Sequence, residues 1–392
     1  MTRSTFLELT AEQQQHAEHC TKCIAREIRE RGGSIGFDEY MQLILHDHSV
    51  GYYHTQQPVF GEQGDFVTVP ETSVHLAYCI AHACAGLIRD DAQRCILEIG
   101  AGRGQLVLDV IRCLHAWGIT PRKYYIFEPS KVLRATQREL LEKQMPEAMS
   151  VVEWLPDLQA ALGSVLVIAN EVLDALPVKC FVADSQQIKE RCVVSSEQGG
   201  LGWQVQDPSY ALDAALDYLT VMLDSPPTTD VYCSEINLEL ETTLDTWSNC
   251  CEQCIMFLID YGYPQSEYYH PQRNMGTLRS YFRHQVSENP FVYPGLQDIT
   301  ADVNFSALAK AATRLNMGVL SFGSQRNFML ANSLLDWRPT GKTEAEQVAQ
   351  VAQLKQLTLG SAVGERFQVM VLGKGIEYGP DRFTLRDMRA RL

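Results

Sequence analysis

The segment from residue 95 to residue 118 constrains the fold of this chain more than any other part of the sequence. An apolar run predicts a buried parallel strand over 95–99, and apolar residues at helical spacing predict a helix over 105–117. Between them, "GAGRG" predicts a tight turn built on three glycines (Gly100, Gly102 and Gly104). A strand, a glycine turn and a helix in this order are typical of a nucleotide-binding site.

The spacing of the glycines and two nearby acids indicate which nucleotide this turn would bind. A dinucleotide fingerprint has its third glycine five positions after the first, and Gln105 occupies that place here. Glu98 lies inside the predicted strand, and Glu128 ends the next one, where a carboxylate can accept hydrogen bonds from both hydroxyls of a ribose. A pyrophosphate requires a helix N-terminus without a nearby carboxylate, whereas a sulfonium cation tolerates one. These features favour S-adenosylmethionine over a nicotinamide cofactor, although the glycines alone would also suit a tight turn in another α/β protein.

This combination resembles the class I S-adenosylmethionine-dependent methyltransferases. The resemblance implies that the glycines let the backbone approach the cofactor, that Glu98 supports its amino-acid end and that Glu128 holds its ribose. Trp154 ends the third predicted strand, where such enzymes meet adenine, so we expect this side chain or Leu155 to contact the base. A tryptophan in the hydrophobic core is the alternative for this position.

Strands and helices alternate along the chain in a way that indicates an α/β fold. We expect a mostly parallel, Rossmann-like sheet of the class I methyltransferase type with helices on both faces, plus an N-terminal helical extension and an insertion subdomain. Further strands are predicted at 123–128, 150–154, 165–169, 255–260, 366–373 and 382–386, and further helices at 11–31, 37–46, 74–90, 130–144 and 343–358.

The same pattern divides the chain into three predicted parts. Residues 1–90 form N-terminal helices and a loop that covers the cofactor. Residues 91–180 and 251–392 form the methyltransferase core with a C-terminal elaboration. Residues 181–250 interrupt the alternation of strand and helix, so they are expected to form an insertion or flap within the core.

Composition excludes several other functions. The formal net charge of −15 argues against nucleic-acid binding, because phosphate contacts require a dense cationic surface. No stretch approaches the roughly 18–20 apolar residues of a membrane span, and the N-terminus has no apolar signal region. The 12 cysteines are scattered through a long chain, so we expect reduced thiols and a cytoplasmic location. Neither the cysteines near 20–23 and 250–254 nor the histidines at 46, 48 and 54 have a spacing that predicts a metal site.

The sequence "IANEVLDALPVKCF" at residues 168–181 holds the candidate acceptor site. Polar residues at the carboxyl end of a parallel strand face the ligand crevice, so we expect Asn170, Glu171 and Asp174 to line the site of the methyl acceptor. Two carboxylates can grip an arginine guanidinium through its fork of donors. The alternative is a helix that starts at an asparagine cap and has an acidic first turn.

A longer series of motifs runs from about residue 34 to 375, in the order "SIGFDEYMQLILHDHSVGYY", "FGEQGDFVTVPETS", "LEIGAGRGQL", "FEPSKVLRATQ", "ANEVLDALPV", "LIDYGYP", "GTLRSYFRHQ", "PGLQDITADVNF" and "ERFQVMVLGKG". Together these motifs resemble the MidA-like family, which has a mitochondrial member that methylates arginine and assists the assembly of respiratory complex I. The resemblance implies a class I methyltransferase fold, S-adenosylmethionine as donor and a protein arginine as acceptor.

One motif of this resemblance adds site residues, and another departs from the family. "GDFVT" places Gly64 and Asp65 in a loop that is expected to close over the cofactor and exclude water, with an ordinary Gly-Asp turn as the alternative. The family pattern T-A-H-V-D-F is "TADVNF" here, with Asp302 in the place of histidine and Asn304 in the place of aspartate. His284 in "YFRHQ" stays in register, but no catalytic role is predicted for it.

Together these features predict a methyltransferase that uses S-adenosylmethionine to modify an arginine of a protein substrate. A non-catalytic assembly or scaffold protein of the same fold is one alternative, which the altered "TADVNF" keeps open. A small-molecule methyltransferase is the other, because specificity would lie in the insertion and in the loops at 261–300. A homodimer is a candidate oligomeric state.

Overall fold

The structure is a computed structural model that describes residues 9–54, 74–159, 161–184, 187–196, 199–222, 231–283, 285–339, 343–358 and 366–392. The chain forms two compact units. The smaller one consists of Met1–Phe66, Leu176–Leu238 and Pro271–Ala301, and the larger one of Val67–Ala175, Glu239–His270 and Asp302–Leu392. This division differs from the predicted domains, because helix α4 (Val74–Asp90) falls in the larger unit and residues 271–301 fall in the smaller one.

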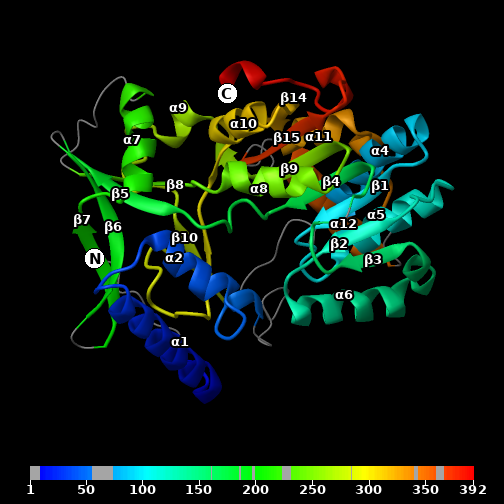
Figure 1. The fold of residues 1–392 in the computed structure, drawn as a ribbon. Helices are drawn as coiled ribbons and strands as arrows, with labels where there is room; N and C mark the ends of the chain where they lie inside the picture. The colour runs from blue at the N-terminus through cyan, green and yellow to red at the C-terminus, as the bar shows by residue number, and fades with distance from the viewer. Residues whose placement is uncertain are drawn as a thin grey trace. The chain divides into compact units, whose positions relative to one another are not determined.

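The larger unit is built on the mostly parallel sheet that the sequence predicted (Figure 1). The strand order is β14-β15-β9-β4-β1-β2-β3. Strand β15 runs antiparallel to both of its neighbours, and the other pairs in this order are parallel. The bounds are β1 (Cys95–Ile99), β2 (Tyr124–Phe127), β3 (Val152–Leu155), β4 (Ser164–Asn170), β9 (Gln253–Tyr263), β14 (Gly318–Ser324) and β15 (Phe367–Lys374), and β13 (Val303–Asn304) pairs with β9. The carboxyl ends of the parallel strands therefore meet at one edge of the sheet.

Helices cover both faces of this sheet. On one face, α4, α5 (Gln105–Ala116) and α11 (Gln325–Ala331) share an apolar cluster with strand residues such as Ile96 and Ile168. On the other face, Phe305 of α10 (Phe305–Arg314) lies 5.2 Å from Phe322 of β14 between ring centroids, and α10 packs against α8 (Leu240–Asn249). The remaining helices of this unit are α6 (Lys131–Gln144), α9 (Gln265–Tyr268) and α12 (Glu344–Thr358), with short helices η3 (Pro146–Ser150), η4 (Leu334–Asp336), η5 (Pro380–Arg382) and η6 (Arg389–Arg391).

The C-terminal segment differs from its prediction. The strand expected at 382–386 is wrong, because η5 occupies its start and no strand follows it. Phe383 is buried and lies 6.0 Å from Phe257 between ring centroids, whereas Leu385 is exposed. Phe383 therefore packs onto the sheet through its side chain without strand pairing, and a short alternating pattern in the sequence does not distinguish these two arrangements.

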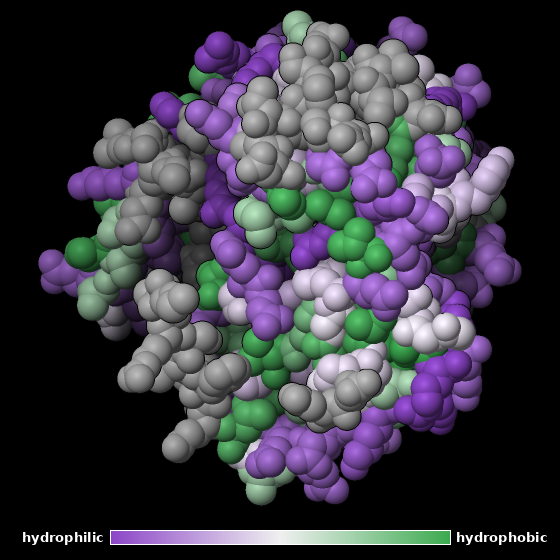
Figure 2. Space-filling view, turned by 90° about the vertical axis from the view of Figure 1, so that its left-hand side faces the viewer, coloured by the Kyte–Doolittle hydropathy of each residue, from purple (hydrophilic) through white to green (hydrophobic). Residues whose placement is uncertain are grey.

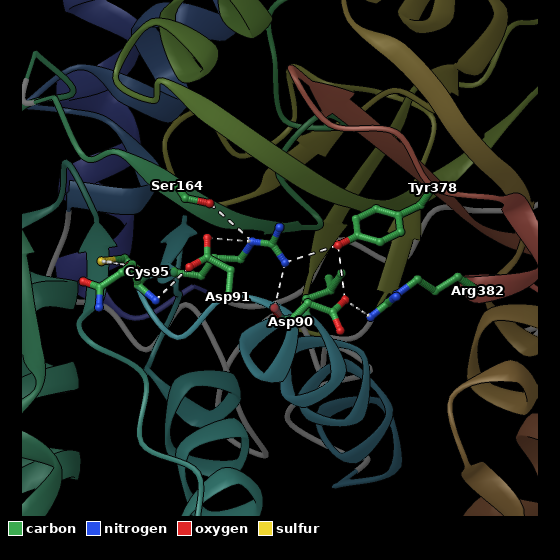
Figure 3. A network of polar contacts seen from close by, with 9 residues as sticks. Asp90, Asp91, Cys95, Ser164, Tyr378 and Arg382 are labelled. Atoms are coloured by element: carbon green, nitrogen blue, oxygen red, sulfur yellow. Dashed lines mark hydrogen bonds and ion pairs between the residues drawn. The ribbon is translucent and has the colours of Figure 1, made fainter.

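A buried arginine joins elements at the amino-terminal edge of the sheet (Figure 3). Arg94 donates from Nη1 to the Leu87 carbonyl near the end of α4 at 2.7 Å and from Nε to Ser164 Oγ at 3.3 Å. Its Nε also lies 3.7 Å from Asp91 Oδ2, and Nη1 is 3.5 Å from the Tyr378 hydroxyl. Because the side chain is only 7% exposed, water cannot replace these contacts.

We expect Arg94→Ala to lower the free energy of unfolding by about 2–4 kcal/mol, because it leaves the buried Leu87 carbonyl without its charged donor. Urea unfolding followed by circular dichroism measures this change. Arg89→Ala is the matched control, since Arg89 lies at the end of α4, five residues before Arg94, but is exposed, and it should shift stability by no more than about 0.5 kcal/mol. Equal unfolding midpoints for the two variants would contradict the role of Arg94.

The smaller unit combines helices with two antiparallel sheets of strand order β7-β6-β5-β8 and β11-β10-β12. Phe37 and Tyr40 of α2 pack in one apolar cluster with Cys180 of β5 and Val193 of β6. The bounds are α1 (Ala11–Glu30), α2 (Phe37–Met41), η1 (Gln42–His46), η2 (Tyr52–His54), β5 (Lys179–Ala183), β6 (Ile188–Ser195), β7 (Leu201–Gln206), α7 (Tyr210–Met222), β8 (Tyr232–Ile236), β10 (Arg279–Phe282), β11 (Gln285–Ser287) and β12 (Asp298–Thr300). The predicted N-terminal helices and the strand-rich start of the insertion are therefore present.

The surface mixes polar and apolar residues. Figure 2 shows hydrophilic residues along much of the margin of the face that it draws and groups of hydrophobic residues nearer its centre. Large apolar side chains that are exposed include Val205, Tyr210 and Met275. In the described part of the chain, no helix has both the length and the apolar character that crossing a membrane requires.

Candidate functional site

The predicted glycine turn joins β1 to α5 and adopts a backbone that only glycine accepts readily. The φ angles of Gly100, Gly102 and Gly104 are +68°, +51° and +90°, which lie in the left-handed region. A Cβ on Gly100 would lie 2.8 Å from Val172 Cγ2, closer than van der Waals contact allows. The Gly100 N–H donates to the Phe127 carbonyl at 3.0 Å, so the turn is tied to the end of β2.

Glu98 occupies a buried position on β1 directly before this turn. Its carboxylate accepts a hydrogen bond from the hydroxyl of Tyr124 on the neighbouring strand. Burial raises the pKa of Glu98 to about 7, the nearby Glu128 carboxylate acts in the same direction, and the Tyr124 hydrogen bond opposes both. Glu98 therefore anchors β1 against β2 beneath the turn, and its support of the amino-acid end of the cofactor stays a prediction.

Glu128 follows β2 at the carboxyl edge of the sheet. Its Oε1 accepts from the Ser130 N–H at 2.9 Å, and its Oε2 accepts from Gln137 Nε2 at 3.4 Å. Ser130 also caps α6 by accepting from the Leu133 N–H at 3.3 Å. Burial raises the pKa of Glu128 to about 7, and the hydrogen bonds from Ser130 and Gln137 oppose that shift. The orientation of this carboxylate is thus set by the first turns of α6.

Trp154 is half-buried near the end of β3, next to the buried Leu155. Its indole N–H donates to Gln137 Oε1 at 2.8 Å, and the Arg138 guanidinium carbon lies 4.3 Å from the ring centroid. Arg138 therefore covers one face of the ring through a cation–π contact. An adenine base at this position would have to use the other face, the ring edge or Leu155.

The predicted acceptor residues lie at the end of β4 (Asn170) and in the loop that follows it, whose backbone is under local strain. Glu171 has a φ of +52°, which costs a residue with a side chain about 1–2 kcal/mol. Its N–H donates to the Ile259 carbonyl at 2.9 Å, and its Oε1 accepts from Asn170 Nδ2 at 3.2 Å. Residues 171–178 form bends and turns, so the alternative of a capped helix start at Asn170 is wrong. Strain of this kind is characteristic of functional positions.

Asp260 on β9 holds this loop in place. Its Oδ2 accepts from the N–H groups of Leu173 at 2.9 Å and Asp174 at 3.2 Å, and its Oδ1 accepts from the Tyr261 N–H at 2.8 Å. Burial and the charge of Glu171 raise the pKa of Asp260 well above its usual value, while the backbone donors oppose this shift. Asp174 is itself buried, and the two hydrogen bonds to Asp260 fix the backbone of the loop that carries it.

The structure brings these predicted residues to one edge of a single sheet and adds two that the sequence analysis left without a role. The additions are Asp260, which lay in the motif "LIDYGYP", and Gln137, which lay in "FEPSKVLRATQ". The motif was the only available signal for Gln137, whereas Asp260 also ends the strand predicted at 255–260, near the expected crevice. Asn304 lies in "TADVNF", the motif that departs from the family pattern. Its side chain caps α10 by accepting a hydrogen bond from the Ala307 N–H at 3.1 Å.

Some predicted residues cannot be compared with the structure. Gly64, Asp65 and His284 lie outside the described residues. Among the residues that are described, no group of three or more histidine, cysteine, aspartate or glutamate side chains is arranged to hold a metal ion.

Comparisons with known proteins agree with this geometry. Residues 79–323 match a family described as S-adenosyl-L-methionine-dependent methyltransferases. The chain is 25% identical to "Protein arginine methyltransferase NDUFAF7 homolog, mitochondrial" of Drosophila melanogaster over 384 residues, which cover 90% of this chain and 85% of that protein. It is 27% identical to "Protein arginine methyltransferase NDUFAF7, mitochondrial" of Mus musculus over 379 residues, with coverage of 87% and 81%. A solved structure from Burkholderia thailandensis, bound to S-adenosyl-homocysteine, is 32% identical with a TM-score of 0.90 and coverage of 99% and 100%.

These relatives correct the predicted location. Both curated relatives are named as mitochondrial proteins, so the expectation of a cytoplasmic location is wrong. That expectation rested on scattered cysteines, which indicate reduced thiols but do not distinguish the cytosol from another reducing compartment.

Proposed function

This chain belongs to the S-adenosyl-L-methionine-dependent methyltransferases, and we propose that its methyl acceptor is an arginine guanidinium of a protein substrate. Family membership confirms the predicted enzyme class, the fold and S-adenosylmethionine as methyl donor. The arginine acceptor is supported by the curated relatives, which are named protein arginine methyltransferases.

The immobilised acidic loop after β4 is the observation that carries this proposal. Asn170 Oδ1 is buried and has no hydrogen-bond partner among the described residues, and the Glu171 carboxylate lies beside it. A buried acceptor oxygen next to a carboxylate suits a ligand with several N–H donors and a positive charge. A guanidinium has five such donors in a planar fork, which makes it a better match than a neutral hydroxyl or a carbon nucleophile.

The residues of the glycine turn also fit the donor. S-adenosylmethionine supplies a methyl group already activated by its sulfonium, so the protein needs mainly to align the reacting atoms. The left-handed turn lets the backbone pass close to the donor without a side chain in the way, and we assign the ribose hydroxyls to Glu128. Alignment of this kind can lower a barrier by about 7–11 kcal/mol.

Glu171 and Asp174 would act on the acceptor side. An arginine side chain stays protonated because its pKa exceeds about 12, so its nitrogen is a weak nucleophile. Pairing with these carboxylates would fix the plane of the guanidinium, direct one nitrogen at the methyl carbon and accept the proton that leaves during or after transfer. No strong general base is needed for such a step.

Incubation of the purified protein with methyl-labelled S-adenosylmethionine and a mitochondrial extract tests the proposal, with mass spectrometry of the modified residue as the readout. We expect label on the guanidinium of a protein arginine. Label confined to small molecules would support the small-molecule alternative. Binding of no S-adenosylmethionine in calorimetry would support the scaffold alternative.

A further inference from the structure

Gln137 on α6 contacts all three parts of the sheet edge that we assign to the donor. The side chain is fully buried, and its Nε2 donates to the Gly102 carbonyl at 2.7 Å and to Glu128 Oε2 at 3.4 Å. Its Oε1 accepts from Trp154 Nε1 at 2.8 Å. One amide therefore links the glycine turn, the acid after β2 and the end of β3.

Close packing fixes the position of this amide. A Cβ on Gly104 would lie 3.2 Å from Gln137 Cγ and 3.3 Å from its Cα, so α6 and the turn approach each other as closely as a glycine permits. The same helix contacts Glu128 at its start, through the Ser130 N–H. The carboxylate is therefore held from two successive turns of one helix.

The chemistry of the three contacts requires an amide. The Gly102 carbonyl and the Glu128 carboxylate accept hydrogen bonds, while the Trp154 indole donates one. Glutamine supplies two donors and one acceptor in that arrangement, whereas an ionised glutamate has no donor and methionine has no donor and only a weak thioether acceptor. Because the Gln137 side chain is fully buried, bulk water could not readily replace a lost contact.

We propose that Gln137 is a positioning residue for donor binding, which sets the Glu128 carboxylate and the Gly102 carbonyl in the orientation that receives the ribose end of S-adenosylmethionine. This inference rests on the proposed placement of the donor at the glycine turn and deepens it. Gln137 acts through Glu128, so its removal should weaken donor binding and alter how that binding depends on pH.

The direction of the pH effect follows from the groups around Glu128. Its ionised form accepts hydrogen bonds from the ribose hydroxyls, and burial places its pKa at about 7, so donor affinity should fall as the pH drops through that value. The Ser130 N–H, the Gln137 amide and the charge of Arg134 all favour the ionised form. The Glu98 carboxylate is the negative charge nearby on β1. Loss of the Gln137 donor should therefore move the fall in affinity to a higher pH.

Gln137→Met tests this inference, because it keeps the length of the side chain and removes every polar contact. At pH 8 we expect calorimetry with S-adenosyl-homocysteine to show affinity about 10- to 100-fold weaker than wild type. The KM for the donor should rise in parallel, while kcat at saturating donor changes by less than about threefold. Gln144→Met is the matched control. Gln144 lies on the same helix, is exposed and makes one hydrogen bond, with Arg112. The affinity of this variant for S-adenosyl-homocysteine should therefore stay within about twofold of wild type.

A double-mutant cycle with Glu128→Gln separates positioning from a general loss of packing. If Gln137 acts through Glu128, the combined affinity loss should be at least about fivefold smaller than the product of the two single losses. Multiplicative losses, or wild-type affinity in Gln137→Met, would overturn the inference while leaving the donor site in place. If Gln137→Met does not fold, Gln137→Asn replaces it in the experiment, because asparagine keeps the amide but is too short to make the same contacts. A wild-type protein that bound no S-adenosyl-homocysteine would overturn the donor site itself.

Discussion

Glu171→Gln is expected to bind S-adenosyl-homocysteine as tightly as wild type and to lose methyl transfer to arginine by about 10²–10³-fold in kcat. The change replaces the carboxylate that we place against the acceptor guanidinium, and it keeps the shape of the side chain. An amide cannot stabilise the positive charge or take the proton that leaves the nitrogen. Calorimetry measures the donor affinity, and the rate of methylarginine formation by mass spectrometry measures the transfer.

Glu142→Gln provides the matched control for this result. Glu142 lies on α6 and is exposed, so the same loss of one negative charge should leave transfer within about twofold of wild type. Turnover by Glu171→Gln at the control rate would remove Glu171 from the acceptor site. Loss of donor binding in Glu171→Gln would instead indicate that the loop after β4 supports the donor.

Gly102→Val is expected to weaken donor affinity by at least about 100-fold without unfolding the protein. Its φ of +51° lies in the left-handed region, where a β-branched residue is strained, and the added side chain would stand where the backbone must approach the donor. The Gly102 carbonyl would also shift relative to Gln137, which donates to it. Calorimetry with S-adenosyl-homocysteine and urea unfolding measure the two properties separately.

Gly118→Val separates backbone strain from the effect on the site. Gly118 follows the other end of α5 with a φ of +67°, and a Cβ there would meet no atom within 4 Å. The two variants should therefore lose similar stability, about 1–2 kcal/mol each, while only Gly102→Val loses donor affinity. Donor binding that survives in Gly102→Val would show that the donor does not approach this turn.

The fold and the backbone of the glycine turn could be predicted because their signals are local. The left-handed turn requires glycine at every second position, and the sequence shows this directly at residues 100, 102 and 104. Glu98 and Glu128 lie near the ends of two predicted strands, so the prediction of the strands is enough to place both acids near the edge of the sheet. Strand β14, which pairs with β15, was not predicted, because "GVLSFGS" mixes small and apolar residues without a clear alternation.

The sequence by itself determined the class of fold, the cofactor and the strand ends at which the polar residues gather, because backbone conformation and hydrophobic periodicity depend on neighbouring residues. Only the tertiary structure decided which side chains hold those residues in place. Asp260 fixes a loop 86 residues earlier in the chain, and Gln137 joins three segments through one amide. Arg138 covers a ring face of Trp154 that the sequence left open to adenine. Such contacts depend on the direction of each side chain and on the approach of distant strands, and no local pattern encodes either.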